Sequence, residues 1–252
     1  MDNIWIIPYL LLPVLVFFEF IFPIHQTGLR ESVKHYLINS FFYLSSKILF
    51  LFMAPLILVS FEIYEIGVFN ALDLNPTLET ILSLILLDFV VWLQHYLTHE
   101  IGLLWKLHRV HHSDTILDCS SAVRFHPFEL CLSLIYKISF CMILGINYQN
   151  YILFEIILVT FAIFGHSNYK INEKISRVIE FVFITPRLHQ IHHSNKNHEM
   201  NSNFGTILNL WDRLFKRFIT SGEVQAHFEL GLKGIEKSEA QKLSFLFTYP
   251  FK

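Results

Sequence analysis

Residues 78–99 read LETILSLILLDFVVWLQHYLTH, an apolar run over 78–94 that passes directly into the pair His95-x-x-x-His99. The run is about as long as a helix needs to cross the hydrocarbon core of a bilayer. Side chains four residues apart share one face of a helix, so the two imidazoles point the same way. The stretch therefore predicts an all-helical membrane protein with paired imidazoles where a span ends.

Two further histidine boxes share one pattern, Leu-His-x-(Val/Ile)-His-His-Ser, over 107–113 and 188–194. Each presents three imidazoles on one helical face. Imidazole at this density suits iron, copper or zinc, and eight imidazoles are too many for one ion. The three boxes therefore predict a site for two metal ions. The expected ligands are His95, His99, His108, His111, His112, His189, His192 and His193.

The composition excludes an ordinary soluble domain. The 252 residues are 53% hydrophobic, include 26 Phe and are only 16% charged, which is too apolar for that class. The formal net charge of −2 gives no sign of a nucleic-acid partner. Cys119, Cys131 and Cys141 form no CxxC pair, so we expect buried or inert thiols facing a reducing compartment.

Apolar runs over 4–24, 41–60 and 78–94 are each expected to cross the membrane. Residues 129–165 hold two shorter runs, broken at Gly145-Ile146-Asn147. We therefore expect a polytopic bundle of about four spans, or three spans and a membrane-embedded hairpin. The first run lacks a positive leader and a small-residue cleavage site, so we do not expect a cleaved signal peptide.

The placement of Lys and Arg orients the spans. Neither residue occurs in 1–29 or between Lys47 and Lys106, whereas Arg30 and Lys34 lie between the first two runs. Loops rich in these cations stay in the cytoplasm. We therefore expect the N-terminus and the 61–77 loop outside, and the boxes on the cytoplasmic side. Residues 166–252 should form a cytoplasmic helical cap, within a single domain that covers the whole chain.

The regions around the boxes resemble the fatty acid hydroxylase/sterol desaturase superfamily of integral membrane di-iron enzymes. The resemblance covers about residues 80–217. Its further signatures, in order, are Arg124-Phe-His126-Pro127-x-Glu129, Gly165-His166-Ser-Asn168, Asn203-Phe204-Gly205 and Trp211-Asp212-Arg213-Leu214-Phe215. The family often has Arg directly after the first histidine, where this chain has Tyr96. That departure concerns a contact around the site or with a lipid headgroup, not a ligand.

The resemblance implies a ninth ligand, His166, because the family commonly draws one from this place. The alternative is a histidine at a helix end that bonds a carbonyl. His126 precedes Pro127, which favours an extended backbone; it could bind metal, support a ligand or serve only the structure. His198 is a further candidate near the third box. The remaining histidines are expected to contact solvent or lipid headgroups: His25, His35 and His227.

Ligating histidines need their other ring nitrogen held, usually by a carboxylate or carbonyl. Asp88 lies seven residues before His95 on the same helix face, and an acid inside an apolar span is expensive. Other candidates for this supporting role, each of which could equally be a helix cap or a solvated charge, are Asp114, Asp118, Asn203 and Asp212.

The resemblance implies two iron ions that activate dioxygen and oxidise a C–H bond of a lipid, fatty-acyl or sterol substrate. A hydroxylase (monooxygenase) is our first interpretation, and a desaturase or methyl oxidase with the same site is the alternative. The chain has no flavin, haem or iron–sulfur motif, so electrons should come from a b-type cytochrome or a ferredoxin. Basic residues that could dock such a carrier, or contact anionic lipids, are Lys170, Lys174, Arg177, Arg213, Lys216 and Arg217.

Two other classes fit less well. A zinc hydrolase is disfavoured because His99-Glu100 lacks the rest of an HExxH motif, and eight ligands exceed one catalytic zinc site. A non-catalytic, metal-stabilised membrane protein is expected to have a broken box, and none is broken here. Zinc in a purified sample would not decide between these classes, because zinc can replace iron at such sites.

Overall fold

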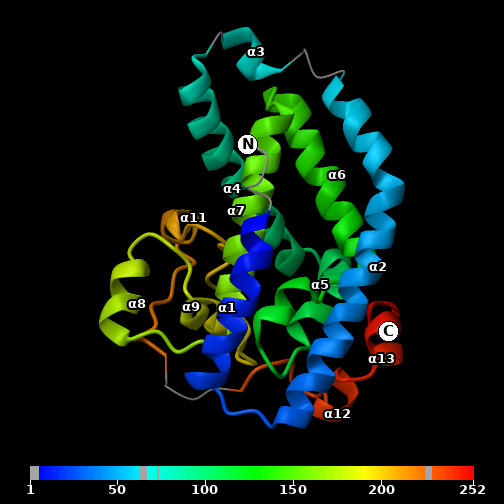
Figure 1. Ribbon diagram of the computed structural model, residues 1–252, viewed down its shortest axis with the longest axis vertical. Coiled ribbons are helices and arrows are strands. Elements are labelled where there is room, and N and C mark those ends of the chain that lie inside the picture. The colour runs from blue at the N-terminus through cyan, green and yellow to red at the C-terminus, as the bar shows by residue number, and fades with distance from the viewer. Residues whose placement is uncertain (1–5, 63–66, 73, 225–228) are drawn as a thin grey trace.

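Helices make up every named element of the computed structural model, which describes residues 6–62, 67–72, 74–224 and 229–252. Four of these helices are long and apolar enough to cross a membrane (Figure 1). They are Leu29–Met53 within α2 (Leu29–Glu62), α4 (Pro76–Glu100), α6 (Pro127–Leu144) and α7 (Tyr148–His166). The prediction of an all-helical membrane protein with about four spans is confirmed.

A tight turn at Gly145 joins α6 to α7. Gly145 has φ +75°, and a Cβ atom there would lie 2.1 Å from the side-chain oxygen of Asn70, so the position requires glycine. Asn147 then starts α7, because its side chain accepts a hydrogen bond from the backbone N–H of Asn150 at 2.8 Å. The two apolar runs predicted within 129–165 are therefore separate helices of 18 and 19 residues.

The first two predicted runs differ from the observed helices. α1 (Ile7–Ile21) has 15 residues, fewer than the about 20 that a span needs. α2 begins at Leu29 instead of near 41. No Gly or Pro lies between Leu29 and Pro55, so the helix continues through residues that are not apolar enough to show in a hydropathy pattern. The start of α2 therefore lies beside the cap (Figure 1).

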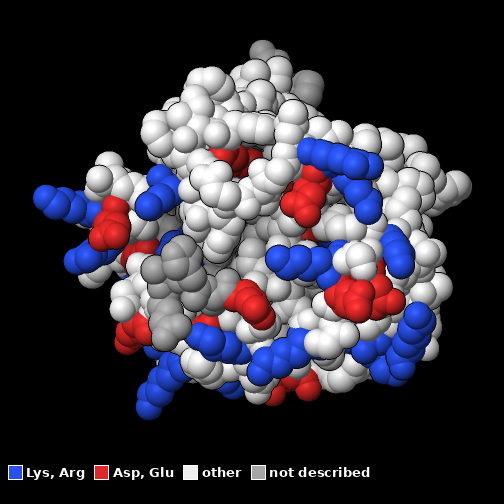
Figure 2. All heavy atoms as spheres, turned by 90° about the horizontal axis from the view of Figure 1, so that it is seen from below, with Lys and Arg blue, Asp and Glu red and all other residues white. Residues whose placement is uncertain are grey.

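The shorter helices gather at one end of the spans and form a cap, while α3 (Val68–Leu72) lies at the opposite end (Figure 1). The cap helices are α5 (Gly102–His112), α8 (Glu173–Ile179), α9 (Pro186–His192), α10 (Asn197–Met200), α11 (Leu210–Leu214), α12 (Lys237–Ala240) and α13 (Leu243–Thr248). Figure 2 views this end and shows Lys and Arg side chains spread around it among Asp and Glu. The helical cap is thus observed. The side of the membrane that it faces stays a prediction.

Separate apolar clusters hold the spans and the cap. Leu87, Cys141 and Phe154 are buried between α4, α6 and α7, whereas Leu246 of α13 is buried against Phe42 of α2. The three cysteines are free, two of them buried and Cys131 partly buried, in line with inert thiols. The histidine boxes lie at the junction of the two regions, where α4 and α7 end.

Candidate metal centre

Nine histidine side chains converge where α4 and α7 end against α5 and α9. They form two groups, and within each group one ring nitrogen per residue lies within 4.8 Å of all the others. The first group is His95, His99, His108, His112 and His192, and the second is His111, His166, His189 and His193. The fold thus brings together every histidine of the three boxes and His166.

Each of the two three-histidine boxes has members in both groups. In the second box, His108 and His112 belong to the first group and His111 to the second. In the third box, His192 belongs to the first group and the outer pair to the second. Side chains four residues apart on a helix point almost the same way. A side chain three residues after the first is turned in the opposite sense around the helix axis. One turn of helix therefore serves both groups.

Backbone carbonyls fix the tautomer of three imidazoles. Nδ1 of His95 donates to the carbonyl oxygen of Phe204 at 2.7 Å, and Nδ1 of His192 donates to that of Ser202 at 2.8 Å. Nδ1 of His166 donates to the carbonyl one turn back on α7, also at 2.8 Å. A carbonyl can only accept, so each Nδ1 carries the proton and each Nε2 of the neutral ring keeps a lone pair.

The lone pairs of His95 and His192 face each other. Nε2 of His95 lies 3.0 Å from Nε2 of His192, and neither atom carries a proton to join them. In the second group, Nε2 of His166 lies 3.1 Å from Nε2 of His111 and 2.9 Å from Nε2 of His189. Nitrogens bound at right angles to one ion, about 2.1 Å from it, lie about 3.0 Å apart. The residues present therefore fit metal ions, because a cation would turn a repulsive contact into two bonds.

The box histidines outside the spans are held neutral. Burial, followed by the neighbouring imidazoles, lowers the pKa of His111, His112, His189 and His193 well below the usual value. Burial also lowers the pKa of His192, to about 3. Neutral imidazole is the form that binds a metal. Both ring nitrogens of His112 also lack a hydrogen-bond partner among the described residues, which leaves them available to an ion.

Glu129, in the first turn of α6, supports the second box directly. Its Oε1 accepts a hydrogen bond from Nδ1 of His108 at 2.6 Å, and both side chains are buried. A carboxylate in this place orients the ring and raises its basicity toward a metal. Glu129 was absent from the predicted supporting residues. Its acid group at the edge of an apolar run is the signal that could have identified it.

The loop 202–205 carries the two carbonyls that hold His95 and His192. Asn203 takes φ +52°, a left-handed conformation that Asn tolerates, and its amide donates to the carbonyl oxygens of two neighbouring segments. Asp212 accepts hydrogen bonds from two backbone N–H groups of the loop, both at 2.9 Å. Asn203 and Asp212 therefore support the site through the backbone and not by touching an imidazole.

Two other candidates bind partners outside the histidine groups. Asp88 accepts a hydrogen bond from Nε1 of Trp211 at 2.8 Å, so it joins α4 to α11 and does not hold His95. His126 belongs to neither group. It caps α6 instead, its Nδ1 accepting from the backbone N–H of Phe128 at 3.3 Å, which corresponds to the structural alternative among its three expected roles.

His35 is not a solvent or headgroup contact, contrary to the prediction. Its side chain is fully buried, with Nδ1 2.7 Å from Asp118 and Nε2 2.9 Å from Asp114. Although burial raises the pKa of Asp114, Arg124 and His35 hold it below its usual range. Two acids expected to support box histidines thus bind His35. The prediction was wrong because α2 begins at Leu29 and carries His35 into the interior.

The other histidines lie apart from the two groups. The side chain of His198 is 72% exposed. His25 is partly buried, and its backbone N–H donates to Asn168. His227 lies outside the described residues. Tyr96, the departure next to the first box, has the Arg217 guanidinium 5.2 Å from its ring centre.

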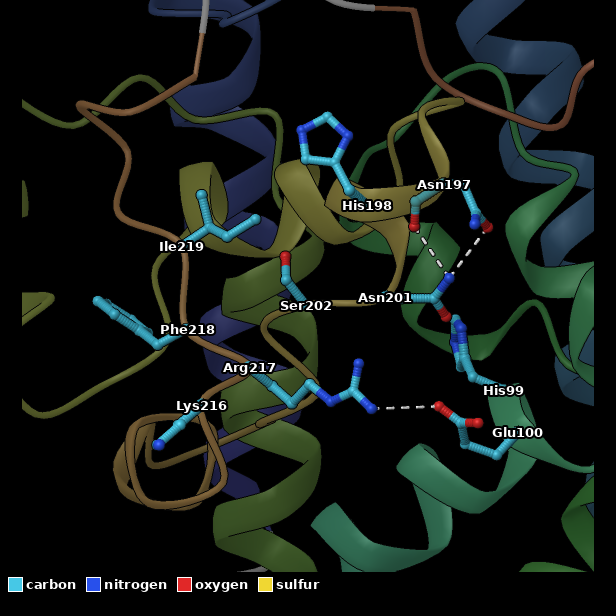
Figure 3. Close-up of a pocket in the computed structure, with 10 residues that line it drawn as sticks. All are labelled: His99, Glu100, Asn197, His198, Asn201, Ser202, Lys216, Arg217, Phe218 and Ile219. Carbon is cyan, nitrogen blue, oxygen red and sulfur yellow. Dashed lines mark hydrogen bonds and ion pairs between the residues drawn. The ribbon is translucent and has the colours of Figure 1, made fainter.

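Two cavities reach the histidines. An apolar cavity of about 350 Å³ lies between α2, α4, α6 and α7 and touches both groups, at His95 and His166 among others. A polar pocket of about 450 Å³ lies in the cap and reaches His99 alone of the nine (Figure 3). In Figure 3, Arg217 points toward Glu100, and their charged groups lie 3.4 Å apart. The site therefore has apolar surroundings on the span side and polar surroundings in the cap.

A buried set of imidazoles at the junction of membrane spans and cap defines a membrane protein suited to hold metal ions. The fatty acid hydroxylase family matches residues 80–217, more than half of the chain. The chain belongs to the fatty acid hydroxylase family. The resemblance seen in the sequence is confirmed.

Several named relatives are similar to between half and two thirds of the chain. The chain is 29% identical over 140 residues to ornithine lipid hydroxylase OlsE of Rhizobium tropici, covering 56% of this chain and 41% of that protein. Alkylglycerol monooxygenases of Caenorhabditis elegans and Homo sapiens are 26% and 24% identical, covering 60% and 54% of this chain and 28% and 29% of theirs. The chain thus spans less than half the length of these relatives. No solved structure matches it.

Proposed function

We propose that the chain is a di-iron, dioxygen-dependent hydroxylase of a membrane lipid. The observation that carries the proposal is the contact between Nε2 of His95 and Nε2 of His192, 3.0 Å apart with no proton between them. One iron would be held by the first group of histidines and the other by the second. Nine imidazoles with no carboxylate would leave the pair more positively charged than the carboxylate-rich sites of soluble di-iron bundles.

In this proposal the protein orients the histidine rings and encloses the reacting atoms. Two bound ferrous ions would supply the electrons and the open positions at which dioxygen is reduced. Glu129 holds the Nδ1 proton of His108, and the 202–205 loop does the same for His95 and His192. Each of these rings therefore turns Nε2 toward the ions. Burial of the site keeps bulk water from the reacting carbon.

The apolar cavity supports a lipid, fatty-acyl or sterol substrate. Its walls are helices that can cross a membrane, so a lipid can enter it from within the bilayer. Relatives named as hydroxylases or monooxygenases of ornithine lipid and alkylglycerol support the same class. A desaturase or methyl oxidase would use the same cavity and ions.

Electrons come from outside the chain in this proposal. Hydroxylation of a C–H bond by dioxygen takes up two electrons and two protons and gives an alcohol and water. A b-type cytochrome, or a ferredoxin with its reductase, is the expected donor. Lys216 and Arg217 border the polar pocket next to His99, and a basic rim suits an acidic carrier. We expect the cap to face the cytoplasm, because such carriers are found there and because loops rich in Lys and Arg stay on that side.

Metal analysis together with labelled dioxygen tests the proposal. The purified protein, reconstituted with iron and supplied with a membrane lipid extract and a reductant, should hold two irons per chain and place one labelled oxygen atom in the product alcohol. An alkene without label, with both labelled atoms in water, would identify the desaturase alternative. Label arriving from water without use of dioxygen would contradict both and favour a hydrolase.

A further inference from the structure

One face of α6 carries polar side chains along the wall of the apolar cavity. Glu129, Ser133 and Lys137 follow at intervals of four residues, so they share a face, and all three line the cavity. Each pairs with a different helix: Glu129 with His108 of α5, Ser133 with Gln94 of α4 at 3.1 Å, and Lys137 with Glu155 of α7. This polar stripe leads away from the histidines into the spans.

The pair farthest along the stripe is the one whose burial costs free energy. Lys137 and Glu155 form a hydrogen-bonded ion pair whose side chains are 10% and 26% exposed, inside two candidate spans. Taking two charges out of water often costs more than their attraction returns, and an apolar pair of similar size is often as stable. Charged groups within spans commonly mark the path of a ligand. Packing α6 against α7 therefore does not by itself account for the pair.

The ion pair and the histidines share one cavity. Lys137 lies eight residues beyond Glu129 on α6, a rise of about 12 Å. Glu155 lies eleven residues before His166 on α7, a rise of about 16 Å. A single lipid chain can therefore touch the charged pair and the metal ligands at once.

We propose that Lys137 and Glu155 form a binding station for a polar group of the substrate; this rests on the proposed function. The pair is neutral overall and offers both donors and acceptors. It therefore fits a hydroxyl or an amide better than a carboxylate or an amine, each of which would leave one charge unbalanced in an apolar cavity. The substrate class is a neutral lipid that carries such a group roughly 12 to 16 Å from the oxidised carbon.

Binding of tritiated 1-O-hexadecylglycerol, a neutral lipid with two hydroxyls, tests the station in the purified, iron-reconstituted protein. Palmitate and hexadecane are the competitors, and each should displace the probe at least about tenfold less well than unlabelled 1-O-hexadecylglycerol, the loss expected for one charge-assisted hydrogen bond. The double variant Lys137→Met/Glu155→Met keeps the volume and leaves no unpaired charge, so it should fold. It should bind the probe at least about tenfold more weakly. Ser139→Ala, on an exposed face of the same helix, should bind it unchanged.

Two results would overturn the station. One is equal affinity of the double variant and the wild type for the probe. The other is hexadecane displacing the probe from the wild type as well as 1-O-hexadecylglycerol does. Iron content separates this inference from the proposed function. A wild type that discriminates among the three lipids but holds no iron contradicts the di-iron site alone, whereas two irons without discrimination contradict the station alone.

Discussion

His192 uses its two ring nitrogens in different ways, one to bind a backbone carbonyl and one to face a second imidazole. The Ser202 carbonyl fixes its proton on Nδ1, and its Nε2 faces that of His95. We expect His192→Ala to lose at least the iron of the first group and all lipid oxidation, measured by metal analysis and product formation. His198→Ala, which changes an exposed ring outside both groups, should keep the iron. Full iron content and turnover in His192→Ala would contradict the assignment.

His35 should matter for stability and not for metal binding. Removing the ring leaves Asp114 and Asp118 buried with less charge compensation, and breaking a buried pair costs about 3–5 kcal/mol. His35→Ala should therefore lower the free energy of unfolding by about that amount in chemical denaturation in detergent. His198→Ala should stay within about 0.5 kcal/mol of the wild type. A His35→Ala variant as stable as the wild type would show that the ring is not the partner of these acids.

Buried imidazoles should make the metal-free protein sensitive to acid. Five box histidines have folded-state pKa values below the usual 6.5, that of His192 at about 3: His111, His112, His189, His192 and His193. Below about pH 6.5 the unfolded chain binds protons that the folded chain excludes. Stability is therefore full above that pH and falls toward pH 3, by about 1.4 kcal/mol per pH unit for each group that stays neutral. A thermal unfolding midpoint of the metal-stripped protein that stayed constant as the pH was lowered from 6.5 would contradict this.

At the residue scale, spacing identified eight of the nine converging histidines, because helical periodicity fixes which side chains share a face. His166 stands alone in the sequence, and only the family resemblance pointed to it. The supporting residues were harder to predict. Asp88 and Asp118 are acids in the right part of the chain, yet they bind Trp211 and His35. Which imidazole an acid meets depends on the packing of distant helices, and a single sequence carries no record of that packing.

At the scale of elements, the hairpin of α6 and α7 depends on one backbone position. Gly145→Ala would place a Cβ atom 2.1 Å from Asn70 Oδ1 and keep φ at +75°. The left-handed conformation alone costs about 1–2 kcal/mol for a residue with a side chain, so we expect at least that loss in the free energy of unfolding. Gly102→Ala is the matched control, since nothing lies within 4 Å of its added atom. Equal stability of the two variants would contradict the strained turn.

Helix boundaries were predicted well only where apolar runs end at a turn signal. Asn75 and Pro76 start α4, and Gly145 ends α6, close to the predicted limits. α2 extends twelve residues before its predicted start near 41, because a stretch without Gly or Pro continues as helix after its apolar character fades. The hydropathy pattern therefore marks the most apolar part of a helix and not the whole helix.

At the scale of the molecule, the cap and the α3 end should lie on opposite sides of the membrane. Lys174 is exposed in the cap and Thr77 is exposed at the other end of the spans. With Cys131 replaced, Thr77→Cys should react with a membrane-impermeant maleimide in intact cells, and Lys174→Cys only after permeabilisation. Labelling of both positions from the same side would contradict the topology. The asymmetry of Lys and Arg predicts this orientation, while the depth of α1 depends on its packing and could not be predicted from its length.

The division of each three-histidine box between the two groups limits how the site can change in evolution. Each of these two boxes gives nitrogens to both groups, so deleting either box removes candidate ligands from both groups. A lineage that needs only one ion cannot reach that state by losing a box. It would have to change scattered single positions while keeping both helices. A lineage that keeps either group must therefore keep both three-histidine boxes. Variation that preserves the site is confined to point changes around these two boxes.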